Sequence, residues 1–217
     1  MRALAQAVLP PSVVVWSGPA AKSNENSERR RQRRVALTFD DGPTPLTRDY
    51  LAVLERFDAR ATFFVVGELC ARHPEWVHAI SSRGHELAGH GYTHQRFTKL
   101  SKSELSSELE RTQALLPPSK RRRPLLRPPH GAVSLSSVVA CARAGFTLAL
   151  WSYDSGDSRT ERADDVAKEF LLRPVDPGAI VLFHEGQAWT LDALPTILQT
   201  LRRAGHELCT VGELLGD

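Results

Sequence analysis

Two adjacent carboxylates, Asp40 and Asp41, follow a short apolar stretch, Val35–Phe39, and precede a Gly-Pro turn. Like charges side by side raise each other's pKa unless a cation or a metal ion lies with them. Taken alone, the pair is typical of a solvated turn. A turn can also bring both side chains into one pocket, so the pair becomes a candidate for chemistry if partners lie elsewhere in the chain.

Two histidines, His90 and His94, could be such partners. On one helical turn or a tight loop, imidazoles four residues apart can face one metal ion, although such a pair is more often a surface or core pair. A nearby carboxylate would complete a His-His-Asp set with open positions, which suits a catalytic divalent metal ion. Asp41 is the candidate for this third ligand, and Asp40 is then free to act as a base.

The elements that must position these residues alternate between short strands and longer helices, which favours an α/β fold with a parallel sheet. Further predicted strands run into Arg127, Asp157 and His184. Because the sites of parallel barrels and open α/β sheets lie at the carboxyl ends of strands, all these side chains are predicted to share one site. Strands are predicted over residues 13–16, 35–39, 61–66, 85–88, 125–126, 146–151, 179–183 and 207–210, and helices over 47–57, 74–82, 101–116, 134–144, 163–172 and 191–204.

Size and charge exclude several classes of protein. A chain of 217 residues suits one domain, and 41% hydrophobic and 24% charged residues are ordinary for a globular protein. The net charge of +3 is too small to imply nucleic acid. Its basic excess is concentrated in Arg29–Arg34 and Lys120–Arg123, which are interpreted as solvated surface segments. A basic module that binds membranes or nucleic acid is therefore disfavoured, and a monomer is expected.

The cysteines and the N-terminus say less about function. Cys70, Cys141 and Cys209 are far apart and odd in number, so buried free thiols are expected. Ala3–Leu9 is a weak secretory signal, which favours the cytoplasm over the cell envelope or secretion without deciding the location. No apolar run approaches the ~20 residues of a membrane span. We expect an N-terminal strand and basic exposed loop over residues 1–34, followed by a catalytic domain over 35–217.

Five stretches of the chain resemble, in order, the motifs of the polysaccharide deacetylase family, the NodB-homology domain of carbohydrate esterase family 4. The resemblance spans about Val35 to Leu215. It implies a distorted (β/α) barrel of about seven strands and metal-dependent removal of N-acetyl groups from the amino sugars of a glycan. One divalent ion is implied, with zinc as the expected metal. The stretches are residues 38–43, 90–94, 127–131, 151–157 and 182–184.

The resemblance also implies a role for each matching residue. The metal ligands of the family match Asp41, His90 and His94. Asp40 matches the general base of the family, and Arg127 matches the arginine that holds this base. His184 matches the general acid, and Asp157 matches the residue that orients the acid. Expected substrate contacts are Pro129, His130, Gly131, Tyr153 and Trp189.

Three positions depart from the family pattern. Gly91 replaces the usual Ser or Thr after the first metal histidine, which predicts a missing hydrogen bond beside the metal. His130 replaces a common aromatic residue, and Ser158 stands where a tryptophan often forms a wall for the acyl methyl group. Trp189 could replace that wall, or it is simply a half-buried loop residue.

An alternative function is a metal-bound but inactive carbohydrate-binding protein on the same scaffold, which only those departures support. The retained Asp40 and His184 argue against it, because binding alone needs no acid and base around a metal ion. The sequence leaves the glycan open among peptidoglycan, chitin-like oligomers and lipid-linked amino sugars.

Overall fold

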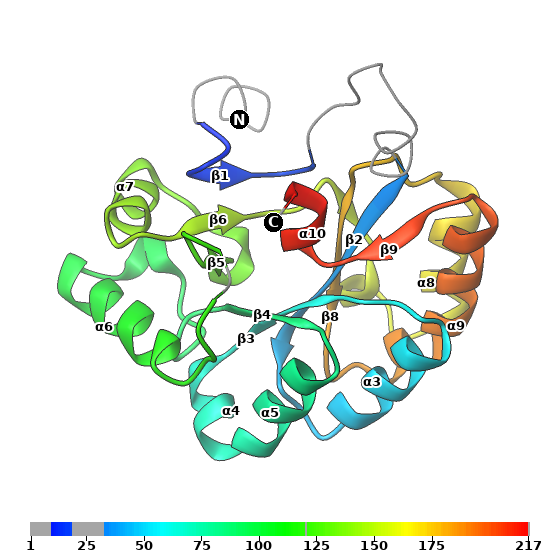
Figure 1. The fold of residues 1–217 in the computed structure, drawn as a ribbon, viewed down its shortest axis with the longest axis horizontal. Coiled ribbons are helices and arrows are strands. Elements are labelled where there is room, and N and C mark those ends of the chain that lie inside the picture. Colours follow the sequence, from blue (N-terminus) through cyan, green and yellow to red (C-terminus); the bar gives the residue numbers. More distant parts are fainter. Residues whose placement is uncertain (1–9, 19–32, 120, 217) are drawn as a thin grey trace.

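The computed structural model describes residues 10–18, 33–119 and 121–216. A curled sheet lies at the centre, and helices cover its outer face (Figure 1). The sheet runs in the order β1-β6-β5-β4-β3-β2-β8-β7, with β9 paired to β2, and every pair of named strands is parallel. The α/β fold with a distorted barrel, predicted from the sequence, is confirmed.

The bounds of the elements are as follows. The strands are β1 (Val14–Val15), β2 (Arg34–Gly42), β3 (Thr62–Val65), β4 (Glu86–Gly89), β5 (Leu125–Leu126), β6 (Thr147–Ala149), β7 (Tyr153–Asp154), β8 (Ile180–His184) and β9 (Glu207–Cys209). The α-helices are α3 (Thr47–Arg56), α4 (Gly67–Arg72), α5 (Pro74–Ser82), α6 (Lys102–Gln113), α7 (Leu135–Arg143), α8 (Ala163–Leu172), α9 (Ala188–Arg203) and α10 (Val211–Leu215). Short 3-10 turns are η1 (Phe97–Lys99), η2 (Pro129–Gly131) and η3 (Asp157–Arg159).

Side-chain alternation along β2 decides what faces the site. Val35, Leu37 and Phe39 belong to the main core between the sheet and the outer helices. The Phe39 ring stacks on Phe63 and Phe183 of the neighbouring strands, with centroids 5.2 and 5.3 Å apart. Because successive side chains of a strand point to opposite faces, Asp40, the residue after Phe39, points into the barrel interior.

The opposite face of the sheet encloses a smaller core, which α10 closes. Ala36 of β2 and Cys209 of β9 pack there with Val211 and Leu214 of α10. Figure 1 shows α10 in the middle of the ring of strands. The Val211 N–H donates to the Thr62 hydroxyl at 2.8 Å, which ties α10 to β3. Near the amino ends of the strands, the interior is therefore filled mainly by apolar side chains, alongside the polar Thr62 and Glu86.

Most helices agree with the sequence prediction. α5 and α8 have the predicted bounds, and Ser101 caps the N-terminus of α6 with the predicted capping box to Glu104. The structure adds α4, α10 and β7, each of which is too short to show a clear period in the sequence. The predicted exposed loop before Arg33 and the weak signal Ala3–Leu9 lie almost wholly outside the described residues.

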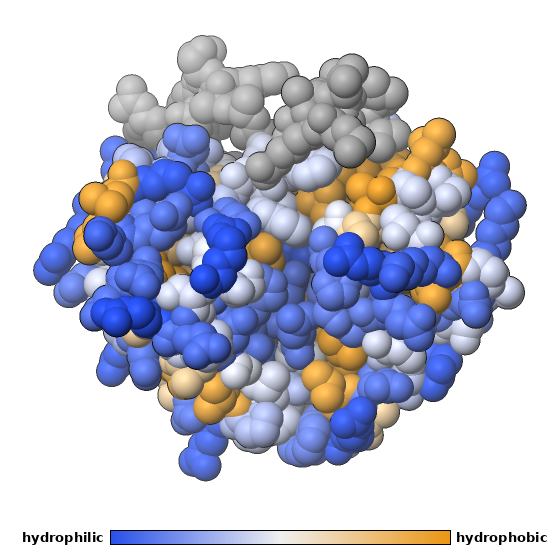
Figure 2. Space-filling model, turned by 180° about the vertical axis from the view of Figure 1, so that it is seen from behind, coloured by the Kyte–Doolittle hydropathy of each residue, from blue (hydrophilic) through white to orange (hydrophobic). Residues whose placement is uncertain are grey.

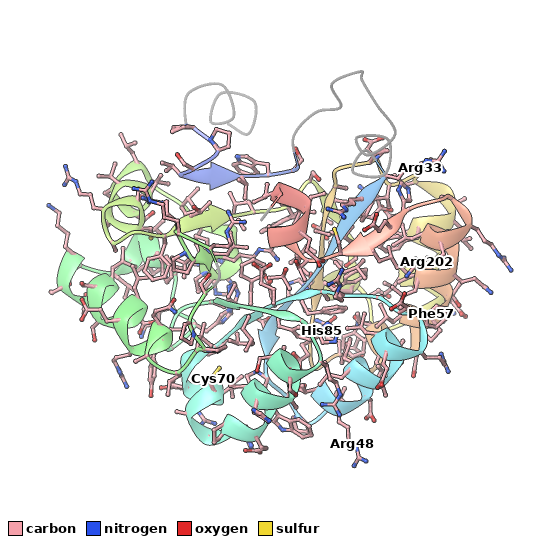
Figure 3. The ribbon with its side chains drawn as sticks, in the orientation of Figure 1. Arg33, Arg48, Phe57, Cys70, His85 and Arg202 are labelled. Carbon is pink, nitrogen blue, oxygen red and sulfur yellow. The ribbon has the colours of Figure 1, made fainter. Side chains whose placement is uncertain are left out.

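The outside of the molecule is tied together by polar contacts and is largely hydrophilic. Arg202 of α9 donates to the carbonyl oxygens of Phe57 and Asp58 at the end of α3 (Figure 3). Seen from behind, the surface is mainly hydrophilic, with separate apolar patches (Figure 2). None of the helices in the described ranges is both long and apolar enough to cross a bilayer. The three cysteines are free and buried, as predicted.

Candidate active site

Asp40 and Arg127 form a buried ion pair inside the barrel. Arg127 is fully buried, and its Nη1 lies 2.7 Å from Asp40 Oδ1 and 2.8 Å from the Thr38 hydroxyl. Its remaining donors reach the carbonyl oxygens of Ala149 and Leu150 at 2.9 and 3.0 Å. With its donors bound to the ends of β2 and β6, the guanidinium cannot rotate, and it fixes the Asp40 carboxylate.

Asp41 turns away from Asp40 toward the two histidines. Its backbone is left-handed, with φ 72°, at the end of β2. Asp41 Oδ1 lies 3.0 Å from His94 Nε2 and 3.4 Å from His90 Nε2, yet it is buried without a well-oriented hydrogen-bond partner. Burial raises the pKa of Asp41, but the two imidazoles outweigh this effect and lower it below its usual range.

The histidines present ring nitrogens suited to a metal ion. His90 is buried, and its Nδ1 donates to the Arg127 carbonyl oxygen at 2.7 Å. Because a carbonyl oxygen only accepts, Nδ1 carries the proton and Nε2 keeps its lone pair for the cluster. The ligand atoms of Asp41, His90 and His94 all lie within 4.8 Å of one another. This cluster could therefore hold a divalent metal ion, and its open side would admit a substrate.

His184 lies beside Asp40 on the neighbouring strand. Asp40 and His184 are register partners of β2 and β8. His184 Nδ1 lies 2.8 Å from Asp157 Oδ1, and its backbone N–H donates to Asp157 Oδ2 at 2.7 Å. Burial lowers the pKa of His184, but the hydrogen bond and charge of Asp157, aided by Asp40 and Asp41, outweigh burial and raise it to about 9. The imidazole is thus held in its cationic form at neutral pH.

The turn after Arg127 forms one wall beside the cluster of Asp41, His90 and His94. Pro129 is buried, whereas His130 is exposed, and its ring lies 4.7 Å from the His94 ring. His130 and Gly131 both have left-handed backbones, with φ 59° and 61°. A Cβ at Gly131 would lie 2.5 Å from the Trp151 ring, so this position requires glycine.

The sequence pattern of the polysaccharide deacetylase family matches residues 27–149, more than half of the chain. The chain belongs to the polysaccharide deacetylase family. It is 35% identical over 96% of its length to peptidoglycan-N-acetylglucosamine deacetylase PgdA of Listeria monocytogenes, and it spans only 43% of that relative. It is 32% identical to the chitooligosaccharide deacetylase of Bradyrhizobium sp., covering 84% of this chain and 90% of the relative.

A solved structure agrees with this assignment. The Bc1960 peptidoglycan N-acetylglucosamine deacetylase superposes with a TM-score of 0.82 at 26% identity, covering 94% of this chain and 93% of the other. The likeness covers nearly the whole of both chains, so the two share one fold.

Two of the predicted substrate contacts of this family member lie elsewhere. Tyr153 pairs in register with Val181, so alternation turns it to the helix-covered face, where it packs on Phe170. Its hydroxyl donates to the carbonyl oxygen of Arg173 at 3.0 Å. Trp189 packs partly against the main core, and its indole N–H donates to the Asp157 carbonyl oxygen at 2.8 Å. The structure thus places Tyr153 on the face of the sheet away from the Asp-His-His cluster, and Trp189 beside Asp157.

Two buried glutamates, absent from the sequence prediction, brace the loops of the site. Glu185 follows His184, and its Oε1 accepts from the Thr44 N–H at 3.0 Å and from the Thr47 hydroxyl. Burial raises the pKa of Glu185 to about 7. Glu108 of α6 accepts three hydrogen bonds from the loop between His90 and His94. Glu185 could have been found from its place directly after the strand-end His184, and Glu108 from its place on the buried stripe of α6 with Leu105 and Leu109.

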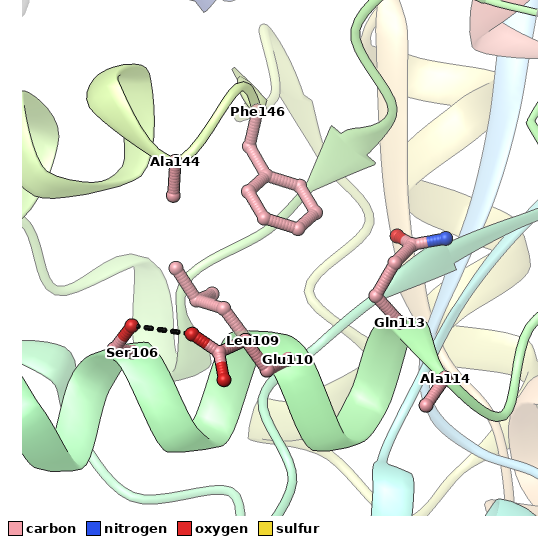
Figure 4. Close-up of a pocket in the computed structure, with 7 residues that line it drawn as sticks. All are labelled: Ser106, Leu109, Glu110, Gln113, Ala114, Ala144 and Phe146. Atoms are coloured by element: carbon pink, nitrogen blue, oxygen red, sulfur yellow. Dashed lines mark hydrogen bonds between the residues drawn. The ribbon is translucent and has the colours of Figure 1, made fainter.

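The pocket between α6 and the end of α7 is separate from these residues. It encloses about 520 Å³ and is lined mainly by α6, together with Ala144 and Phe146 (Figure 4). Its carboxylate, Glu110, is hydrogen-bonded to the Ser106 hydroxyl at 2.8 Å. No residue of the Asp-His-His cluster lines it, so this pocket takes no part in the chemistry of the cluster.

Proposed function

We propose that the protein is a metal-dependent hydrolase that removes N-acetyl groups from the amino sugars of a glycan. The observation that carries the proposal is the pairing of Asp40 with His184 on adjacent strands, while Asp41, next in the chain, joins His90 and His94. A base and an acid beside a metal cluster are what amide hydrolysis requires.

Hydrolysis of an amide needs help at three atoms. The carbonyl carbon is a poor electrophile, water is a poor nucleophile and the amine is a poor leaving group. A divalent ion held by Asp41, His90 and His94 would polarise the carbonyl group and lower the pKa of water. We propose zinc, since two imidazoles and one carboxylate with an open position form a common catalytic zinc set.

Asp40 is proposed as the base that takes the proton of the attacking water. Its carboxylate is buried at 4% exposure, and Arg127 binds only Oδ1 among the contacts of the described residues. The second oxygen, Oδ2, lies 3.7 Å from His90 Nε2 and so faces the metal cluster. Arg127 is a positioning residue for this base.

His184 is proposed as the acid that protonates the departing nitrogen. A pKa of about 9 keeps the proton on the imidazole at neutral pH until the bond to carbon breaks. Asp157 is a positioning residue, because it binds Nδ1 at 2.8 Å and leaves Nε2 to meet the substrate.

A backbone N–H near η2 is proposed to bind the oxyanion of the tetrahedral intermediate. Pro129 has no N–H, and the Gly131 N–H donates to the Pro128 carbonyl oxygen at 3.0 Å. The His130 N–H is therefore the candidate donor. The ring of His130, beside His94, would form one wall of the substrate groove.

The substrate proposal is an N-acetylated glycan such as peptidoglycan or a chitin-like oligomer, since the Listeria and Bradyrhizobium relatives act on these two classes. We propose residues 35–217 as the catalytic domain. The deciding experiment is mass spectrometry of acetyl loss from N-acetylated oligosaccharides and peptidoglycan incubated with the wild type. Asp40→Asn serves as the matched control, and wild-type protein that releases no acetate from any of them in the presence of zinc would refute the proposal.

A further inference from the structure

The five residues His90–His94 form a loop, termed the histidine loop, whose two ends carry the predicted metal ligands. Gly91 and His94 have left-handed backbones, with φ 78° and 60°. The His90 N–H donates to the carbonyl oxygen of Val65 in β3 at 2.9 Å, and beyond it the loop continues neither a helix nor a sheet ladder, so other contacts must hold its backbone groups. Any shift of the loop moves both imidazoles relative to Asp41.

One buried carboxylate binds the donors of the loop. Glu108 is 7% exposed, and its Oε2 accepts from the N–H groups of Tyr92 and Thr93 at 2.7 and 2.9 Å. Its Oε1 accepts from the Thr93 hydroxyl at 2.8 Å. Hydrogen bonds to a charged acceptor are about twice as strong as neutral ones, so this is a strong clamp on two consecutive residues.

The acceptors of the loop are bound from the other side. The Gly67 and Glu68 N–H groups donate to the carbonyl oxygens of Gly91 and Tyr92 at 2.9 and 3.0 Å. Arg111, one turn after Glu108 on α6, places its guanidinium 3.5 Å from the centre of the Tyr92 ring. The loop is thus held between α4 and α6, and Glu108 supplies all the acceptors on the α6 side that the described residues show.

Gly91 fits this arrangement. A Cβ at this position would lie 3.2 Å from the Phe97 ring and 3.3 Å from Glu108 Oε2, on a backbone that side chains rarely adopt. From the family resemblance, Gly91 in place of a Ser or Thr predicts that one hydrogen bond beside the metal is missing. Other contacts of the loop could take the place of this hydrogen bond. Glu108, 17 residues further along the chain, occupies the space beside Gly91 and binds the loop.

We propose that Glu108 is the positioning residue of the metal centre, acting through the backbone of the histidine loop. This inference rests on the proposed metal site. Residues that orient ligands without touching the metal typically change metal affinity by about 10- to 100-fold when replaced. Glu108 would belong to this group because its hydrogen bonds go to Tyr92 and Thr93, between the two metal histidines, rather than to an imidazole ring.

The test is the zinc affinity of the purified full chain, measured by competition with a chromophoric chelator. In Glu108→Gln, the amide oxygen can still accept from the two N–H groups, but without the charge, and the NH₂ group takes the place of Oε1, so the Thr93 hydroxyl must accept instead of donate. We expect zinc to bind about 10- to 100-fold more weakly and the absorption spectrum of the cobalt-substituted protein to change. Glu110→Gln is the control, because Glu110 lies on the same helix and, among the described residues, its carboxylate is bound only to the hydroxyl of exposed Ser106. It should leave both readouts unchanged.

Thr93→Val tests the same clamp if Glu108→Gln does not fold, since it removes only the hydroxyl bond to Oε1. It should weaken zinc binding less than Glu108→Gln. Wild-type zinc affinity and cobalt spectrum in folded Glu108→Gln would overturn the inference, even if urea unfolding showed lost stability. If Glu108→Gln does not fold, wild-type values in Thr93→Val would overturn it instead. Wild-type protein that binds no zinc would refute the metal site itself, which is a distinguishable result.

Discussion

The two ends of the barrel interior both contain a bound carboxylate, but with different partners. At the carboxyl end of β2, Asp40 is paired with Arg127 at 2.7 Å. At the amino end of β4, Glu86 accepts from two uncharged donors, the Thr62 hydroxyl at 2.6 Å and the Gly212 N–H at 2.9 Å. Asp40 adjoins the cluster of Asp41, His90 and His94, whereas Glu86 ties α10 to the sheet.

This difference shows that an enclosed carboxylate is not in itself a sign of chemistry. Burial raises the pKa of Glu86, and its hydrogen bonds and the nearby charge of Arg121 only partly offset that effect. At the other end, charged neighbours reverse the effect of burial, so the pKa of Asp41 is lowered and that of His184 is raised. Opposite charges held close together mark the end that could act on a substrate.

The largest effect is expected when the metal ligands are removed. His90→Ala and His94→Ala each leave two of the three ligands, so we expect stoichiometric zinc in the wild type and little or none in either variant. Metal analysis of the purified proteins checks this. His85→Ala, at the amino end of the barrel, is the control and should keep its zinc. Equal zinc in all four proteins would break the proposed contrast between the two ends.

The next largest effect is expected at the base. Asp40→Asn keeps the size of the side chain but cannot accept the proton of water, so turnover should fall by about 10²- to 10⁴-fold while zinc is retained. Deacetylation rates together with metal content measure both. Turnover close to that of the wild type would mean that Asp40 only balances the buried charge of Arg127.

A smaller effect is expected in the pH dependence of the rate. His184 must be protonated, so activity should fall as the pH rises through its pKa of about 9. Because the hydrogen bond and charge of Asp157 raise that pKa, Asp157→Asn should move the alkaline limb of the pH–rate profile to lower pH and leave zinc content unchanged.

Since zinc-bound water could also set the alkaline limb, a companion variant is needed. His184→Ala should be slow at every pH and retain zinc. An unmoved limb in Asp157→Asn would separate Asp157 from the proton transfer. The His184–Asp157 pair also contributes to the free energy of unfolding. Because the pKa of His184 is raised in the folded chain, this contribution is fully present below the ordinary histidine pKa of 6.5 and is lost as the pH rises through about 9.

Local patterns predicted the α/β class with a parallel sheet and the polar residues at the strand ends, whereas the distorted barrel was implied by the family resemblance. The apolar alternation that ends in Asp40 indicated a strand, and the carboxyl ends of parallel strands meet by topology. Tyr153 was misplaced because β7 has only two residues, and so few give no period from which to tell the inner face from the outer. The short register with Val181 decides its face.

Glu108 shows the other limit of such prediction. Its position on the buried stripe of α6, with Leu105, Leu109 and Thr112, indicates that its carboxylate faces inward. The sequence does not indicate its partners, Tyr92 and Thr93, which lie 16 and 15 residues earlier in the chain. Only the packing of α6 against the histidine loop gives that carboxylate its partners. Contacts of this kind depend on tertiary structure, which neither composition nor periodicity records.

The smallest effect on activity is expected at the amino end. Glu86→Gln keeps an oxygen that can accept from Thr62 or Gly212, so the deacetylation rate and zinc content should equal those of the wild type.

The stability of Glu86→Gln relative to the wild type should nevertheless change with pH. A carboxyl group whose pKa is higher in the folded than in the unfolded chain binds more protons when folded, so the free energy of unfolding falls as the pH rises above its ordinary value of 4.5. Glutamine has no such dependence. The free energy of unfolding of Glu86→Gln, measured in urea, should therefore improve relative to the wild type between pH 4.5 and 7.5, about the range in which a raised carboxyl pKa acts. If the difference in free energy of unfolding between Glu86→Gln and the wild type stayed constant across that range, the pKa of Glu86 would not be raised by folding. The contrast between the two ends of the barrel would then rest on the partners of Asp40 alone.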